Sequence, residues 1–395
     1  MKKTTYLTAA VLAVATLAGC NPTKGPEDDA QTIRDQRFMA IAERFVNHTV
    51  IPTYTSLSDY TEQLVYDLEA LREDVTQANI DKACETFLTA RAYWEKSEAF
   101  LWGAATDFGI DPHIDTWPLD LVGLKEALTN AAQIAGLAGE DGDVYAGEKL
   151  GPTLLGFHGI EYVLFFEGSH RDASWFAEGN TDNGVKCSDY LTYAVAVAGD
   201  LRNKCYQMEI AWAGEDHNPE RYAKVNDELE LPLTMTGGAY YGENLLNAGK
   251  AGSSCINATV AMQWLIEGCN TIADEVASQK IGMVYSGVDK NYVESPYSYM
   301  SIVDFEDNMI SIENVWNGGT EGDYDSTNSL SAYFKETAPE LEKRISDAID
   351  NSIARIKAIP EPFIENYQNE NCGAAIEAIE ELDTALSLAI EELTK

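Results

Sequence analysis

The chain has 395 residues, with 65 acidic and 27 basic side chains, and its formal net charge at pH 7 is −38. Such a charge argues against nucleic acid or an anionic membrane surface as a partner, because both repel an acidic protein. The hydrophobic content of 45% is ordinary for a globular protein, and the length favours two helical domains over one core.

The N-terminus has the pattern of a bacterial lipoprotein signal peptide, which we assign to residues 1–19. Lys2 and Lys3 precede an apolar run over residues 6–18, which is too short to remain in a membrane as a spanning helix. The run ends in Leu17-Ala18-Gly19-Cys20, which resembles a lipobox, the motif whose cysteine thiol is lipidated before cleavage. We therefore predict lipidation at Cys20.

The segment that follows, residues 20–34, predicts a flexible tether between the lipid and the folded part. Its first ten residues are mostly polar and include two prolines and a glycine, so they offer little apolar surface to bury. Asn21, directly after the lipidated position, resembles outer-membrane sorting. The expected location is the outer membrane, facing the periplasm or the cell surface. Six further cysteines could form disulfides there, and the sequence does not choose their pairing.

Helical periodicity dominates the rest of the chain. Apolar residues recur at spacings of three and four in five segments, near residues 57–71, 87–101, 302–316, 345–356 and 374–393. For the third segment, Ser301 and Asp304 predict a capping box, and Gly318-Gly319 predicts the end of the helix.

The sequence thus predicts an all-α fold of two helical-bundle-like domains with long structured loops. Polar residues and glycine interrupt the pattern near residues 180–189, which places an N-terminal domain at residues 35–185 and a C-terminal domain at residues 186–395. A short hairpin is possible around residues 237–242.

The sharpest motif is Gly156-Phe157-His158-Gly159-Ile160-Glu161. A helix over residues 153–166 would be apolar almost all round and therefore buried. His158 and Glu161 are three residues apart and share a face, so both could ligate one metal ion. The alternative is a His–Glu hydrogen bond buried for packing. Gly156 and Gly159 leave a shallow strip that another backbone or a ligand could approach closely.

Polar residues in two other segments are further candidates. Ser97 and Glu98 interrupt an apolar stripe, which indicates either a functional site or a boundary position. In the next loop, His113 and Asp115 could supply ligands, although capping a turn is the simpler role for Asp115.

The segment before residue 301 carries Glu294, Ser295 and Ser298. These polar groups precede a helix N-terminus, so they could line a pocket or bind an anion. A capped turn with aromatic packing is the simpler alternative.

Together these residues resemble the imelysin-like family, also classed as peptidase family M75. Gly156-x-His158-x-x-Glu161 is similar to its GxHxxE signature, and the blocks at residues 97–103, 110–120 and 294–298 also look like family blocks. The resemblance implies two helical domains with the signature near their interface, in an envelope protein tied to iron uptake or metal binding.

Two classes of function follow. The first is a binding lipoprotein with a site at His158, Glu161 and Glu98. It would capture a metal ion, with iron favoured and zinc as the alternative, or an iron-linked ligand, and other envelope iron-uptake components could be its partners. The second is a metallopeptidase, which normally needs three protein ligands for its metal. Tyr162 follows Glu161, so the second histidine of an HxxEH motif is missing. A scaffold or glycan-binding lipoprotein is a third possibility.

Overall fold

The computed structural model describes residues 26–395, and the predicted signal peptide, Cys20 and the first part of the predicted tether lie outside this range. Almost all regular structure in the described part is helical, with two small antiparallel hairpins that pair Phe165–Phe166 with Ser169–His170 and Thr181–Asp182 with Val185–Lys186. This confirms the all-α prediction. The hairpin considered around residues 237–242 is absent from the described chain, because that segment leads directly into a helix. No helix within residues 26–395 is long and apolar enough to cross a membrane.

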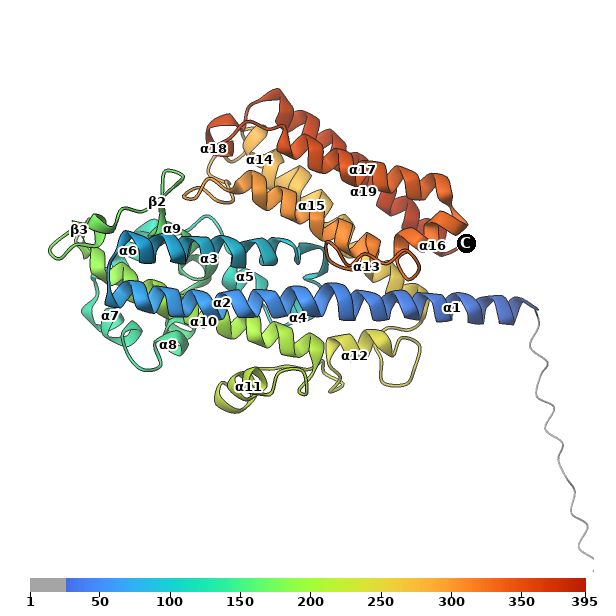
Figure 1. The fold of residues 1–395 in the computed structure, drawn as a ribbon, viewed down its shortest axis with the longest axis horizontal. Coiled ribbons are helices and arrows are strands. Elements are labelled where there is room, and N and C mark those ends of the chain that lie inside the picture. The colour runs from blue at the N-terminus through green and yellow to red at the C-terminus, as the bar shows by residue number, and fades with distance from the viewer. Residues whose placement is uncertain (1–25) are drawn as a thin grey trace, which may run out of the picture.

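Two groups of helices lie side by side (Figure 1). The first contains the long helices α1 (Pro26–Phe45), α2 (Ile51–Glu73), α3 (Gln77–Glu95) and α10 (Cys187–Ala213). The shorter helices of this group are α4 (Ala104–Asp107), α5 (Asp111–Ile114), α6 (Leu121–Thr129), α7 (Ala131–Leu137), α8 (Gly142–Lys149), α9 (Gly156–Leu164), α11 (Pro219–Tyr222) and α12 (Tyr241–Leu246). A π-helical turn, Val46–Val50, joins α1 to α2, so the two form one continuous rod.

The second group is formed by the C-terminal part of the chain. Its helices are α13 (Ala258–Glu275), α14 (Gly282–Tyr285), α15 (Ser301–Asn317), α16 (Leu330–Thr337), α17 (Pro339–Lys357), α18 (Phe363–Asn366) and α19 (Glu370–Leu393). Helix α19 packs against α13 and α17, and α15 packs against α3 of the first group. The two groups therefore meet between α3 and α15.

The contacts of α10 place it with the N-terminal helices. The predicted boundary at residues 185 and 186 falls at the start of α10, but α10 packs against α2, α8 and α9. The first group therefore extends through α12, because the apolar side of α10 is covered by N-terminal helices. Residues 26–34, assigned to the tether, form the first turns of α1. Proline is tolerated in the first turn of a helix, so Pro26 does not interrupt it.

Local packing explains two further differences from the sequence prediction. Helix α3 ends at Glu95 and does not reach Leu101, because the Ser97 hydroxyl bonds to the Trp94 carbonyl and a 3₁₀ turn follows at Glu98–Phe100.

The capping box at Ser301 does not form. Ser301 is the first residue of α15, and its hydroxyl accepts a hydrogen bond from the backbone N–H of Ser295. The end of α15 is as predicted, since Gly318 adopts the left-handed conformation with φ of +68°.

The six cysteines of the described chain are all buried and unpaired. Each behaves as a small apolar side chain, so disulfides do not hold this part of the fold together.

Candidate functional site

A group of buried ionisable side chains lies where the two groups of helices meet. We call it the buried cluster, and none of its members is more than 9% exposed. Its members are Arg91, Glu95, Glu98, Asp115, His158, Glu161, Lys280, Glu294 and Asp304.

The motif glycines bring the first pair of the cluster together. Gly156 has φ of +69°, and a Cβ at this position would lie 1.8 Å from the carbonyl oxygen of Ile114. Only glycine therefore lets the start of α9 approach the backbone next to Asp115. At Gly159 a Cβ would lie 2.1 Å from the Tyr193 hydroxyl oxygen. Protein atoms, from the Ile114 backbone and the Tyr193 side chain, therefore lie against both glycines.

His158 lies between two carboxylates. Its Nε2 is 3.1 Å from Asp115 Oδ1, and its Nδ1 is 3.4 Å from Glu161 Oε2. Burial alone would lower the pKa of His158, but the contacts with Asp115 and Glu161 outweigh burial and raise it to about 9. In the metal-free protein the imidazole is therefore protonated at neutral pH.

Glu161 ties α9 to the segment before α15. Its Oε1 accepts hydrogen bonds from the backbone N–H of Tyr297 at 3.1 Å, from the backbone N–H of Ser298 at 2.8 Å and from the Ser298 hydroxyl at 2.7 Å. Hydrogen bonds to a buried carboxylate are strong. Glu161 thus links the two groups of helices, a role that the sequence did not indicate.

Arg91 is the main counter-charge of the cluster. Its guanidinium bonds to Asp115, lies 2.9 Å from Glu294 Oε1 and lies 2.5 Å from Glu95 Oε1. Asp115 also accepts a 2.6 Å hydrogen bond from the Trp94 indole. Burial raises the pKa of the Asp115 carboxyl, but Arg91 and His158 more than offset this and hold it well below its usual range. Asp115 does not merely cap a turn, because it is the shared neighbour of Arg91 and His158.

Lys280 supplies the second full positive charge. It lies in the π-helical turn Val276–Ile281, and its Nζ is 3.1 Å from Glu294 Oε1 and 3.6 Å from the nearest oxygens of Glu95 and Glu98. Such turns often occur at functional sites, because they re-aim one side chain.

Negative charge exceeds positive charge in the buried cluster. Six carboxyl groups face Arg91, Lys280 and a protonated His158, which leaves three negative charges uncompensated if every carboxyl group is ionised. Burial raises the pKa of Glu294 to about 7, and it raises the pKa of Glu98 and Asp304 as well. The cluster therefore favours the uptake of protons or of a cation.

The donor set fits a metal ion. Asp115, His158 and Glu294 offer ligand atoms that all lie within 4.8 Å of one another, as do Glu95, Glu98 and Asp115. Two buried atoms of the first set, His158 Nε2 and Glu294 Oε2, lack a hydrogen bond of good geometry within residues 26–395. One imidazole with carboxylate oxygens suits iron or zinc. Neither set contains Glu161.

The other candidates from the sequence divide between the cluster and its surroundings. The Ser295 hydroxyl donates to Asp304, and Ser298 contacts Glu161. The Ser97 hydroxyl donates to the Trp94 carbonyl at 2.7 Å. His113 lies apart, with its Nε2 2.7 Å from Asp200 Oδ2.

Sequence reasoning missed Arg91, Glu95 and Lys280. The first two stand four residues apart beside the apolar stripe of Ala90 and Trp94, and Lys280 directly precedes buried Ile281. Charged residues within such apolar surroundings were the available signal.

Comparisons with known proteins agree with this architecture. The sequence model of the imelysin family, peptidase M75, matches residues 50–389. Iron-regulated protein A of Synechococcus elongatus is 25% identical over 347 residues, which are 88% of this chain and 83% of that protein.

Solved structures show the same fold. A protein from Parabacteroides distasonis, named as a candidate iron-regulated protein A precursor, aligns with a TM-score of 0.74 and 26% identity over 91% of this chain and 95% of its own. An imelysin-like protein from Psychrobacter arcticum aligns with a TM-score of 0.56 and 12% identity over 91% and 93%, which supports the fold alone. Because the family matches most of its length, this chain belongs to the imelysin family.

Proposed function

We propose that this protein is an envelope lipoprotein that binds a metal ion or an iron-linked ligand at the buried cluster and serves iron uptake. Its relatives include proteins named for iron regulation. The observation that carries the proposal is the excess of buried carboxyl groups around His158 and Glu294. Within residues 26–395, Glu294 Oε2 is buried without a hydrogen bond, and the partner of His158 Nε2 is itself a carboxylate, that of Asp115 at 3.1 Å.

Asp115, His158 and Glu294 would hold the ion. A bound cation supplies positive charge where Arg91 and Lys280 leave a deficit, and it takes the place of protons on His158 and Glu294. Mixed oxygen and nitrogen donors favour iron, with zinc as the alternative.

The burial of the cluster favours binding over peptide hydrolysis. His158, Glu161 and Glu294 are each 1% exposed. A peptidase must bring a substrate carbonyl to its metal and keep one coordination position open. A polypeptide does not reach this depth without separation of the two groups of helices, whereas a small ion does.

The test is elemental analysis of the purified protein together with thermal melts, with and without ferrous, ferric and zinc ions. We expect a bound ion and a raised melting temperature in the parent, because a ligand that binds only the folded state stabilises it. Glu294→Gln keeps the size and shape of the side chain but removes its charge, so this variant should neither bind the ion nor show the rise in melting temperature.

The matched control is Asp307→Asn. Asp307 is also buried at this interface and pairs with Lys96 at 3.4 Å, but it lies outside both donor sets. Its replacement should leave the response to metal intact. A parent that neither contains nor responds to any of these ions would rule out the metal site.

The membrane anchor is a separate part of the proposal and has its own test. Cys20→Ala should abolish labelling with fatty acid and release the protein from the membrane fraction, because the apolar run before it is a removable signal. Retention of this variant in the membrane pellet would contradict lipidation at Cys20.

A further inference from the structure

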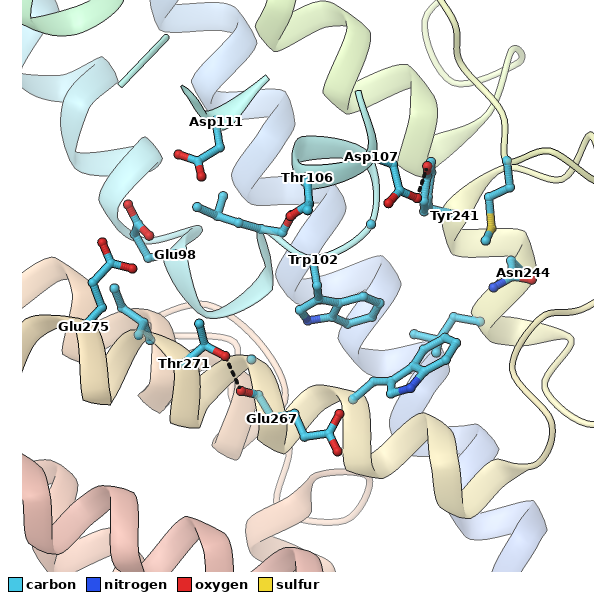
Figure 2. A pocket seen from close by; sticks show the side chains of 17 residues that line it. Glu98, Trp102, Thr106, Asp107, Asp111, Tyr241, Asn244, Glu267, Thr271 and Glu275 are labelled. Carbon is cyan, nitrogen blue, oxygen red and sulfur yellow. Dashed lines mark hydrogen bonds between the residues drawn. The ribbon is translucent and has the colours of Figure 1, made fainter. Parts of the chain in front are cut away.

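A pocket of about 530 Å³ opens beside the buried cluster. It lies between α13, α12 and the segment from Glu98 to Asp111 (Figure 2). This volume is within the range of small-molecule sites, which are usually pre-formed clefts lined by aromatic groups and a few polar ones.

Three carboxylates converge at one end of the pocket. Figure 2 shows Glu98, Asp111 and Glu275 facing one another from three different elements. In the part of the chain that the structure describes, none of the three accepts a side-chain or backbone hydrogen bond, and their one ion-pair partner is Lys280, 3.6 Å from Glu98. Glu98 is buried in spite of this lack of donors, since only 9% of its surface is exposed.

This acidic end is electrostatically unsatisfied. Burial, together with the charges of Asp115 and Glu275, raises the pKa of Asp111 to about 6. Glu161, by contrast, has three donors on one oxygen. A buried carboxylate without donors is costly, and a cationic partner removes the cost.

Aromatic side chains line the other part of the pocket. Trp102 and Trp264 meet edge to face with their ring centroids 5.9 Å apart, and Tyr241 also lines the pocket. Gly268 makes this possible, because a Cβ there would lie 2.9 Å from the Trp102 indole nitrogen. Indole and phenol rings attract organic cations and also bury apolar groups.

We propose that this pocket binds a small organic ammonium compound, with the amino group between Glu98, Asp111 and Glu275 and the apolar body against Trp102 and Trp264. The chemistry follows from the lining: three carboxylates meet at one end, and the rest offers aromatic surface. Asp107, which accepts a hydrogen bond from the Tyr241 hydroxyl, and Glu267 add two further carboxylates beside the aromatic rings, and no basic side chain of the described chain lines the pocket. A bare metal ion fits less well, since neither set of close ligand atoms in the described chain includes Asp111 or Glu275. The proposal does not depend on a metal in the buried cluster.

The experiment uses chelator-treated protein and two probes of similar shape, 2-phenylethylammonium and neutral 2-phenylethanol, with calorimetry and tryptophan fluorescence as readouts. We expect the ammonium probe to bind with a change in tryptophan emission. The alcohol should bind at least about tenfold more weakly, which is the effect of about 1.4 kcal/mol. Equal binding of the two probes, or no binding of either at millimolar concentration, would overturn the proposal.

Two variants test where the amino group of the probe binds, and a third variant serves as the control. Glu275→Gln and Asp111→Asn should each weaken the ammonium probe by about tenfold and leave the alcohol unchanged. Glu377→Gln makes the same charge change on an exposed face of α19, away from the pocket, and should bind like the parent. If Glu275→Gln does not fold, Asp111→Asn alone decides. Unchanged binding in folded acidic-end variants contradicts the assignment, whatever the outcome of the metal experiments.

Discussion

Two glutamates of the cluster are both buried but differ in the hydrogen bonds that their carboxylates accept. Glu161 is 1% exposed and accepts three hydrogen bonds from the segment before α15. Glu98 is 9% exposed, accepts no hydrogen bond within residues 26–395, and faces a pocket. The comparison teaches that burial of a carboxylate alone does not indicate its role. Satisfied acceptors hold the fold together, and unsatisfied ones are available to a ligand.

The largest effect expected from this comparison is on stability, at Glu161. Glu161→Ala should lower the free energy of unfolding by about 3–5 kcal/mol, because His158 and three donors would lose a buried partner. Glu161→Gln should cost about 1.5–3 kcal/mol, because the donors keep an oxygen but lose its charge. Chemical denaturation measures both. A Glu161→Gln protein as stable as the parent would show that Glu161 is not a structural link.

The next effect concerns pH. His158, Glu294 and Asp111 have raised pKa values of about 9, 7 and 6, so the folded state binds more protons than the unfolded one. The stability that these groups contribute should therefore be complete only below about pH 4, where the carboxyl groups are protonated in the unfolded chain as well. The free energy of unfolding should fall by several kcal/mol as the pH rises from about 5 to about 9. The lowered pKa of Asp115 affects the free energy of unfolding only at acidic pH, below this window.

The same pH series with excess iron sharpens the result. A bound cation replaces the protons, so metal binding strengthens as pH rises. The melting temperature of the metal-loaded protein should therefore depend less on pH than that of the metal-free protein. Stability of the metal-free protein that increased from pH 6 to 9 would have the wrong sign for these shifts.

A smaller effect of opposite sign to that at Glu161 is expected at the acidic end of the pocket. Asp111→Asn should stabilise the ligand-free protein by about 1–2 kcal/mol at pH 8, because it removes a repelled, partly buried charge. The gain should shrink as the pH falls through 6 and vanish only below about pH 4, where Asp111 is protonated in the unfolded chain as well. Destabilisation at pH 8 would mean that this carboxylate has a partner in solution.

The smallest effect is expected at His113. Its contact with Asp200 is partly exposed and lies outside the cluster. His113→Asn should change stability by less than about 1 kcal/mol and should leave the response to metal ions unchanged. Loss of that response in calorimetry would bring His113 back into the site.

The sequence predicted where helices form better than it predicted which helices pack against one another. The leucine periodicity from Leu57 to Leu71 and the glycines of the motif are local signals, and both correspond to buried positions in the structure, although Tyr60 between the leucines is exposed. Which group α10 joins, and which donors meet Glu161, depend on contacts between residues far apart in the chain. Periodicity carries no information about such contacts.

The site was accordingly predicted only in part. His158, Asp115, Glu98 and Glu294 do share one cluster, but the sequence offered no way to see that Arg91 and Lys280 lie among them. Glu98 was identified because it interrupts a stripe, yet α3 ends before it and a 3₁₀ turn aims it at the pocket. The sequence thus identified Glu98 correctly, although the helix on which it was placed ends at Glu95.

The rod formed by α1 and α2 has a mechanical consequence. Its 26–73 span is roughly 70 Å of continuous helix, with α1 against α13 of the second group and α2 against α3 and α10 of the first. Because this rod packs against both groups of helices, it resists a rotation of one group relative to the other. Bending is easiest at the π-helical turn Val46–Val50, where the regular hydrogen-bond ladder is interrupted. Any widening of the interface around His158 would therefore pivot at that turn, far along the chain from the residues it exposes.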